Sequence, residues 1–172
     1  VMRIARLFAL GLLLAPAAPA PATAATPTKI AVFDVELYDT SLEGEMRGKD
    51  PAEAARLKTL SAMLREAVAA RDDMTPVDTA PLDERLAKLP ALYSCGGCEA
   101  KLAGELGAER SVSAYVYKIS TLILYITVAV RDTASGKLLE EASVSIRGNT
   151  DDSWRHGLQS LLQRRIFKAS VE

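Results

Sequence analysis

The sequence predicts a single α/β domain: a mixed sheet of about four to five strands, including a three-stranded antiparallel meander, flanked by three helices. Two observations carry this prediction. Apolar residues recur at three- and four-residue spacing in residues 52–70 and again after Asp151, which is typical of helices that bury one face. Between residues 111 and 146 the spacing changes to two, which is typical of strands with one core face.

The first 24 residues have the features of a secretory signal peptide. Arg3 and Arg6 give a positive start, an apolar run occupies residues 7–14, and Ala22-Thr23-Ala24 matches a small-x-small cleavage pattern. The apolar run is shorter than the ~20 residues needed to span a bilayer. We therefore expect residues 25–172 to form one exported α/β domain in the periplasm of a Gram-negative bacterium, with no membrane span in the mature protein.

Charge and composition exclude several classes of partner. The formal net charge is −1, and loss of Arg3 and Arg6 with the signal peptide makes it more negative. Nucleic acids and anionic membrane surfaces select strongly basic faces, so neither is expected as a partner. The single histidine, His156, excludes a histidine-rich metal site. We expect no metal and no cofactor.

The folded part begins with a strand at residues 29–37. Its nearly continuous apolar run indicates burial on both faces and a central place in the sheet. Residues 38–49 lose this periodicity and contain two glycines, which predicts an exposed loop. The acidic residues of these two segments are favoured as solvated side chains over a cation site; they are Asp34, Glu36, Asp39, Glu43 and Glu45.

A helix follows, because Asp50-Pro51 is a strong start signal and the apolar spacing continues to about residue 70. Residues 74–77 predict a short strand, which Pro76 restricts to an edge or to a strand start. Residues 79–94 allow one or two helical turns between two prolines.

The second half of the chain predicts the meander and a last helix. Residues 111–119, 121–131 and 138–146 alternate apolar and polar side chains and are read as three consecutive antiparallel strands. Asp151-Asp152 then opens a helix, because carboxylates suit the positive end of the helix dipole.

Two segments of this half carry a resemblance to known domains. Residues 106–114 place Leu-Gly-Ala between a helix and a strand, and residues 128–138 place Arg-Asp-x-x-x-Gly-Lys after a strand. This pattern resembles the TolB amino-terminal and curli-secretion CsgG-like α/β domains, which implies an envelope domain that works through protein contacts. The opening strand, the CGGC pair and residues 147–154 resemble a group of exported bacterial proteins with no assigned function, members of which are sometimes encoded beside quinoprotein alcohol dehydrogenase systems.

The two cysteines, Cys95 and Cys98, stand two residues apart before a helix predicted at residues 99–106. In an exported chain such a pair most often forms a disulfide, although so small a ring stabilises only modestly. The alternative is a thioredoxin-like pair, in which the helix N-terminus lowers the pKa of the first thiol. No aromatic residue directly precedes Cys95 and no proline opens the strand at Ser111. A structural disulfide is therefore favoured over redox activity and over metal or cofactor contact.

Four aromatic side chains are candidates for protein contacts. Tyr115, Tyr117 and Tyr125 alternate with core-facing residues in the meander, so they point to the sheet face opposite the core. If no helix covers that face, they form an aromatic patch of the kind enriched at contact hot spots. Trp154, in the last helix, is the fourth interaction candidate.

The leading functional hypothesis is a non-enzymatic periplasmic accessory or protein-interaction module, because the sequence contains no recognisable catalytic set. The expected partner is an unidentified periplasmic or envelope protein, and the resemblance implies service to an envelope or quinoprotein-type oxidation system. The alternative is a thiol-disulfide redox or electron-transfer protein that uses Cys95 and Cys98. A carrier of a small ligand or metal is a third reading.

Overall fold

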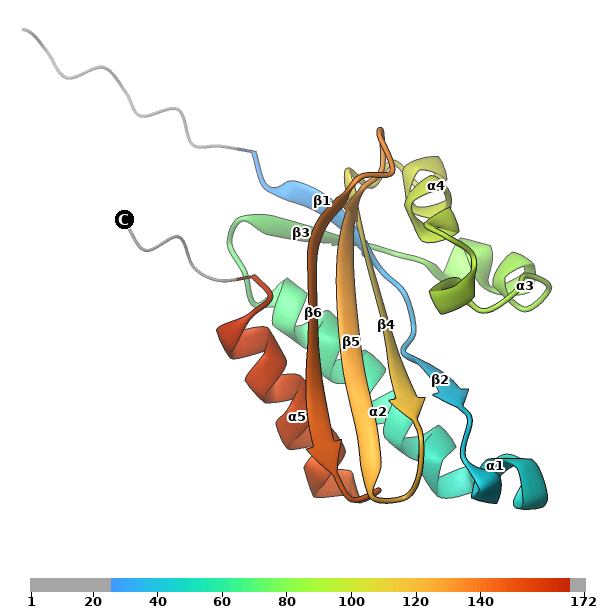
Figure 1. Cartoon of the computed structure of the whole chain (residues 1–172). Coiled ribbons are helices and arrows are strands. Elements are labelled where there is room, and N and C mark those ends of the chain that lie inside the picture. The colour runs from blue at the N-terminus through green and yellow to red at the C-terminus, as the bar shows by residue number, and fades with distance from the viewer. Residues whose placement is uncertain (1–25, 168–172) are drawn as a thin grey trace, which may run out of the picture.

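The computed structural model describes residues 26–167, and the predicted signal peptide at residues 1–24 lies outside the described residues. One mixed sheet forms the centre of the fold, with the strand order β3-β1-β4-β5-β6 and with β2 beside β4 (Figure 1). The predicted fold class is confirmed. The strands are β1 (Thr28–Val32), β2 (Glu36–Asp39), β3 (Met74–Val77), β4 (Arg110–Lys118), β5 (Ile123–Asp132) and β6 (Leu138–Arg147).

Four α-helices and two 3₁₀ turns connect the strands of the described part, and a fifth helix follows the last strand. Asp50 caps the helix α2 as its residue type predicts, because its carboxylate accepts a hydrogen bond from the Ala52 N–H. Between residues 26 and 167, no helix is long and apolar enough to cross a membrane. The elements are α1 (Leu42–Arg47), α2 (Pro51–Ala69), η1 (Ala80–Leu82), α3 (Asp83–Leu86), η2 (Leu92–Ser94), α4 (Cys98–Glu105) and α5 (Asp151–Arg164).

The strand predicted at residues 29–37 is central, but it is split into β1 and β2. Both pieces pair in parallel with β4, β1 along its first half and β2 along its second. The chain leaves the ladder at Val35, whose N–H donates to the Ser61 hydroxyl of α2 at 2.9 Å. The Ser61 side chain of α2 thus accepts a hydrogen bond from a backbone N–H that has left the sheet. The interruption divides the predicted strand into two, so the sheet has six strands.

The segment 38–49, predicted as an exposed loop, contains the short helix α1. Ser41 begins it, because its hydroxyl accepts a hydrogen bond from the Gly44 N–H at 3.1 Å. None of the six residues of α1 is buried, which agrees with the predicted exposure of this segment.

Two hydrophobic cores lie on opposite faces of the sheet. The larger one fills the space between the sheet and the helices α2 and α5, which run along the same face (Figure 1). The smaller one joins Ala31 and Phe33 to η1, η2 and α4 on the other face. Side chains of β1 alternate between the two cores, with Ile30 and Val32 in the first, so burial of this strand on both faces is confirmed. The smaller core covers only one end of its face.

Candidate functional site

The uncovered end of the second face carries a row of stacked tyrosines. Strand pairing sets Tyr38 of β2 opposite Tyr117 of β4, and Tyr117 opposite Tyr125 of β5. The ring centroids are 4.9 Å apart in the first pair and 6.4 Å apart in the second. Both spacings fall in the range of favourable aromatic pairs.

Tyr93 completes this cluster from outside the sheet. Its ring lies 5.1 Å from Tyr38 and 5.5 Å from Tyr115, centroid to centroid. The turn η2 is held there by Glu36 of β2, whose carboxylate accepts hydrogen bonds from the backbone N–H groups of Leu92 and Tyr93 at 3.0 and 3.1 Å. The surface defined by Tyr38, Tyr93, Tyr115, Tyr117 and Tyr125 is called the tyrosine face below; it gathers all five tyrosines of the chain.

The tyrosine face is open to solvent. Tyr38 and Tyr125 are 40% and 36% exposed, and the other three are half-buried against their neighbours. Burial, followed by the nearby charge of Glu36, raises the pKa of Tyr93 above its ordinary value. Its phenol is therefore neutral at physiological pH and can both donate and accept a hydrogen bond.

Exposed aliphatic side chains lie at the same end of the sheet. Leu42 and Met46 of α1 are 69% and 76% exposed, and Leu122 in the turn between β4 and β5 is 69% exposed. The start of α1 is held beside this turn, because the Thr40 N–H donates to the Lys118 carbonyl at 2.9 Å. These side chains enlarge the exposed apolar area at this end of the sheet.

Cys95 and Cys98 form a disulfide that closes the loop between η2 and α4. Gly96 and Gly97 have φ angles of 68° and 99°, a region that favours glycine, so the Gly-Gly pair is what allows so small a ring. Both cysteines are half-buried and pack against the smaller core. The loop leads directly from Tyr93, so it helps to hold that ring over the sheet.

The surroundings of Cys95 contain groups with opposite effects on a thiolate. Its sulfur lies 3.3 Å from the Leu92 carbonyl oxygen and 3.8 Å from a carboxylate oxygen of buried Glu99. Glu99 also accepts a hydrogen bond from Arg131 Nε at 2.9 Å, which ties α4 to β5. The two oxygens disfavour negative charge on the sulfur, whereas the Cys98 N–H, which donates to this sulfur at 3.2 Å, favours it.

Within residues 26–167, the one group whose geometry suits a metal ion is Cys95, Cys98 and Glu99, whose ligand atoms lie within 4.8 Å of one another. Metal binding needs thiolates. The disulfide removes them, and Glu99 is already paired with Arg131. In this state the two sulfurs are bonded to each other, and Glu99 ties α4 to β5 through Arg131.

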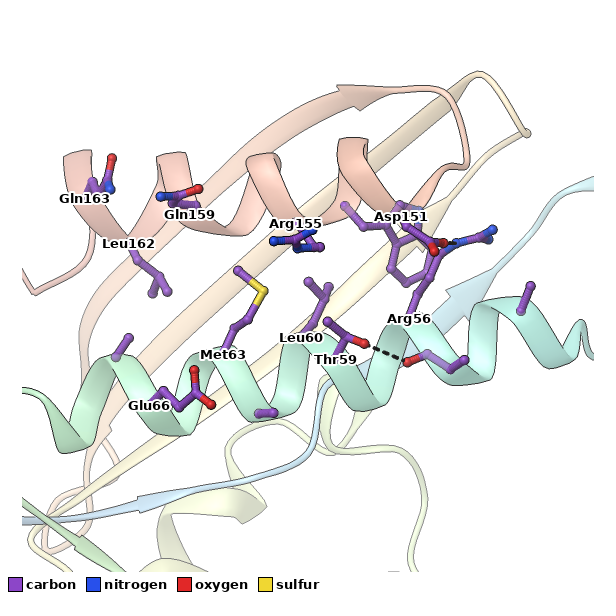
Figure 2. A pocket seen from close by; sticks show the side chains of 15 residues that line it. Arg56, Thr59, Leu60, Met63, Glu66, Asp151, Arg155, Gln159, Leu162 and Gln163 are labelled. Carbon is purple, nitrogen blue, oxygen red and sulfur yellow. Dashed lines mark hydrogen bonds and ion pairs between the residues drawn. The ribbon is translucent and has the colours of Figure 1, made fainter.

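The interaction candidate Trp154 is placed in the larger core, with 0% exposure, so it is not a surface residue. Its ring belongs to the apolar stripe of α5, and the Arg56 guanidinium lies 5.9 Å from the ring centroid. A groove of about 1070 Å³ lies between α2 and α5. Figure 2 shows Met63 and Leu162 pointing into it from the two helices. The ion pair between Arg56 and Asp151, at 2.7 Å, joins the two helices at one end.

Sequence reasoning missed a buried charge cluster at the end of β4. Lys118 is 2% exposed, and its Nζ lies 2.5 Å from Glu53 and 3.1 Å from Asp39. Burial lowers the pKa of Lys118, but the hydrogen bonds to Glu53 and Asp39 outweigh this effect and raise it above its ordinary value. Asn149 also donates to Glu53, at 2.6 Å. The cluster fixes α2 and the start of α5 to the ends of β2 and β4.

The acidic residues predicted as solvated side chains are largely used in protein contacts. Asp34 pairs with Arg65 at 2.7 Å, and Asp39 and Glu43 lie 3.1 and 3.6 Å from the Lys118 ammonium. Glu36 holds η2. Protein cations and backbone donors thus occupy most of these carboxylates.

Fold and site together define a class: a mixed-sheet α/β domain with an open tyrosine face and a disulfide-closed loop beside it. The chain belongs to the family DUF3280, described as "Protein of unknown function (DUF2380)", whose model matches residues 28–166. No curated protein sequence matches the chain.

Several solved structures are similar in fold. The LpoB C-terminal domain from Salmonella enterica matches with 13% identity and a TM-score of 0.49, over 70% of this chain and 82% of that one. The lipoprotein GNA1162 from Neisseria meningitidis matches with 20% identity and a TM-score of 0.46, over 79% and 91%. TolB from Acinetobacter baumannii matches with 12% identity and a TM-score of 0.38, over 74% of this chain and 25% of that one.

Proposed function

We propose that this chain is a non-enzymatic periplasmic accessory module, which binds a periplasmic or envelope protein through the tyrosine face. The observation that supports this most is the stacking of all five tyrosines on the uncovered end of one sheet face, with Tyr38 and Tyr125 40% and 36% exposed. Solvent-exposed aromatic clusters of this kind are typical of contact surfaces.

The physical chemistry of the cluster supports a binding role. Neighbouring rings restrict one another, so little side-chain entropy is lost when a partner covers them. Each phenol also offers a polar group to a partner at the rim of the contact. Removing an exposed ring therefore weakens binding more than it weakens folding.

The identity of the partner is the finer part of the proposal. The resemblance carried by the opening strand, the CGGC pair and residues 147–154 favours a component of a quinoprotein-type oxidation system. A purified quinoprotein dehydrogenase from the same organism is the first partner to test, by titration with the mature chain. Absence of binding at dehydrogenase concentrations up to about 100 µM rules out this partner, because even transient contacts usually have a Kd below that value. The tyrosine face is then tested with other periplasmic proteins.

A site-specific crosslinking experiment tests the surface itself. A photoreactive phenylalanine analogue at Tyr125 is expected to trap one defined periplasmic protein. The same analogue at Thr59, on the exposed side of α2, serves as the matched control and is expected to trap none. Equal products from both positions, or trapping only from Thr59, contradict the proposal.

Export is the second part of the proposal, supported by the pattern of the first 24 residues. The full chain expressed in a Gram-negative host is expected in the periplasmic fraction, with Ala25 as its first residue. Intact-mass measurement of the purified protein checks the cleavage site. Retention of the uncleaved chain in the cytoplasm contradicts this part and leaves the binding surface to be judged separately.

A further inference from the structure

The outer edge of β6 is long and open. Nine of the ten residues of β6 pair with β5, and no other strand between residues 26 and 167 pairs with its second side. Most of its side chains are exposed, including Leu138 and Leu139 at 38% and 42%. An edge of this length presents unpaired backbone donors and acceptors to another strand.

The backbone groups that face outward can be identified from the register. The Gly148 N–H donates to the Leu122 carbonyl, so residues an even number of positions from Gly148 turn their backbone groups toward β5. Ser143 and Ser145 lie at odd spacings and turn theirs toward the open edge. The ladder is regular between the Ile123–Arg147 and Val130–Glu140 pairs, so this assignment holds along that stretch.

The charges of this edge complement one another. Glu141 and Arg147 are six residues apart, so both side chains point to the face that carries the tyrosines. Both are exposed, and neither forms an ion pair with any residue that the structure describes. If β6 pairs with a second β6 in antiparallel orientation, centred on Val144, each Glu141 lies opposite an Arg147.

Other registers lose this match. A pairing centred on Glu141 sets the two acidic side chains opposite each other, which is destabilising. A pairing centred on Ser143 sets Arg147 opposite Leu139. The Val144 register also makes Ser143 and Ser145 a hydrogen-bonded pair, which agrees with the outward direction of their backbone groups.

We propose that the edge of β6 binds a second copy of this chain through an antiparallel pairing of β6 with β6, centred on Val144 and fixed by two Glu141–Arg147 ion pairs. The two sheets then form one continuous sheet, with both tyrosine faces on the same side. A dimer built in this way offers a partner two adjacent contact surfaces.

A charge-swap series measured by sedimentation equilibrium tests this dimer. Glu141→Arg and Arg147→Glu are each expected to raise the dimer Kd at least about ten-fold, because each creates two like-charge contacts. The double variant restores opposite charges and is expected to return the Kd to near the wild-type value. Glu84→Arg, the same charge change at an exposed position of α3, is the control and leaves the Kd unchanged.

A second measurement needs no variant. Amide exchange in the wild type is expected to slow at Ser143 and Ser145 as the protein concentration rises through the Kd, while exchange at Val144 changes little. A monomer at all concentrations up to about 500 µM, a dimer indifferent to both single variants, or no recovery in the double variant each overturns the proposal.

Discussion

At the scale of single residues, Lys118 is notable because its charged side chain is buried in the fold. The Lys118 ammonium lies beside the carboxylates of Glu53 and Asp39, and these opposite charges neutralise one another. Lys118→Met is expected to lower the free energy of unfolding by about 3–5 kcal/mol, since it leaves buried carboxylates without a cation. Urea denaturation of the variant and the wild type measures the loss.

Two comparison variants make this prediction specific. Lys137→Met, at an exposed position, is expected to change stability by less than about 0.5 kcal/mol. Lys118→Met with Glu53→Leu is expected to be more stable than Lys118→Met alone, because the unpaired charge is removed. A loss below about 1 kcal/mol for Lys118→Met contradicts the role given to the cluster.

The positions of individual site residues were predictable only where a local sequence pattern indicates which face of the sheet they occupy. Alternation along the meander identified Tyr115, Tyr117 and Tyr125 correctly as residues of the face opposite the larger core. Tyr38 joins them because β2 pairs with β4. Tyr93 joins them because the Glu36 carboxylate accepts hydrogen bonds from the backbone of η2. Both are contacts between distant parts of the chain, which periodicity does not encode.

At the scale of elements, the packing of α5 on the sheet depends on Gly157. A Cβ atom at this position would clash with Ile146 Cγ2 and would lie 3.2 Å from Ile126 Cδ1. Gly157→Ala is therefore expected to lower the midpoint of thermal unfolding, with a loss of about 1–3 kcal/mol from the forced shift of α5.

Gly104 in α4 supplies the matched control for this substitution. A Cβ atom there meets Thr133 Cβ at 3.6 Å, an ordinary contact. Gly104→Ala is expected to be neutral or to stabilise by up to about 1 kcal/mol, because alanine has the higher helix propensity. Equal effects of the two substitutions would falsify this account of the α5 packing.

The loop closed by Cys95 and Cys98 is expected to behave as a structural joint. Cys95→Ser with Cys98→Ser is predicted to cost about 2 kcal/mol, the chain-entropy value for so small a ring. The reduction potential of the pair is predicted to lie below about −300 mV, outside the range of catalytic thiol oxidoreductases. A value between about −270 and −120 mV instead favours the redox alternative.

Elements with strong start signals and long periodic runs were predictable, as α2, α5 and the meander are. The break between β1 and β2 was not, because Phe33 and Val35 continue the apolar run and the cause of the break is the Ser61 hydroxyl on a different element. The helix α1 was missed because it buries none of its residues, so it leaves no apolar period to detect.

At the scale of the whole molecule, the two faces of the sheet have different roles. Helices α2 and α5 cover one face along its length, while η1, η2 and α4 cover only part of the other. The uncovered part holds the tyrosine face, with the disulfide loop beside it and the Lys118 cluster on the opposite face at the end of β4. A stable core on one side thus supports an open aromatic surface on the other, and this open surface is the proposed contact surface.

The most direct test of this account compares partner capture by the wild-type mature chain and by Tyr38→Ser with Tyr125→Ser. Both proteins are immobilised at equal amounts and exposed to periplasmic extract, with circular dichroism as the check on folding. The account predicts that a defined protein captured by the wild type is lost from the folded variant, and that Leu138→Ser retains it. Undiminished capture by the folded double variant would contradict the assignment of the tyrosine face as the binding surface.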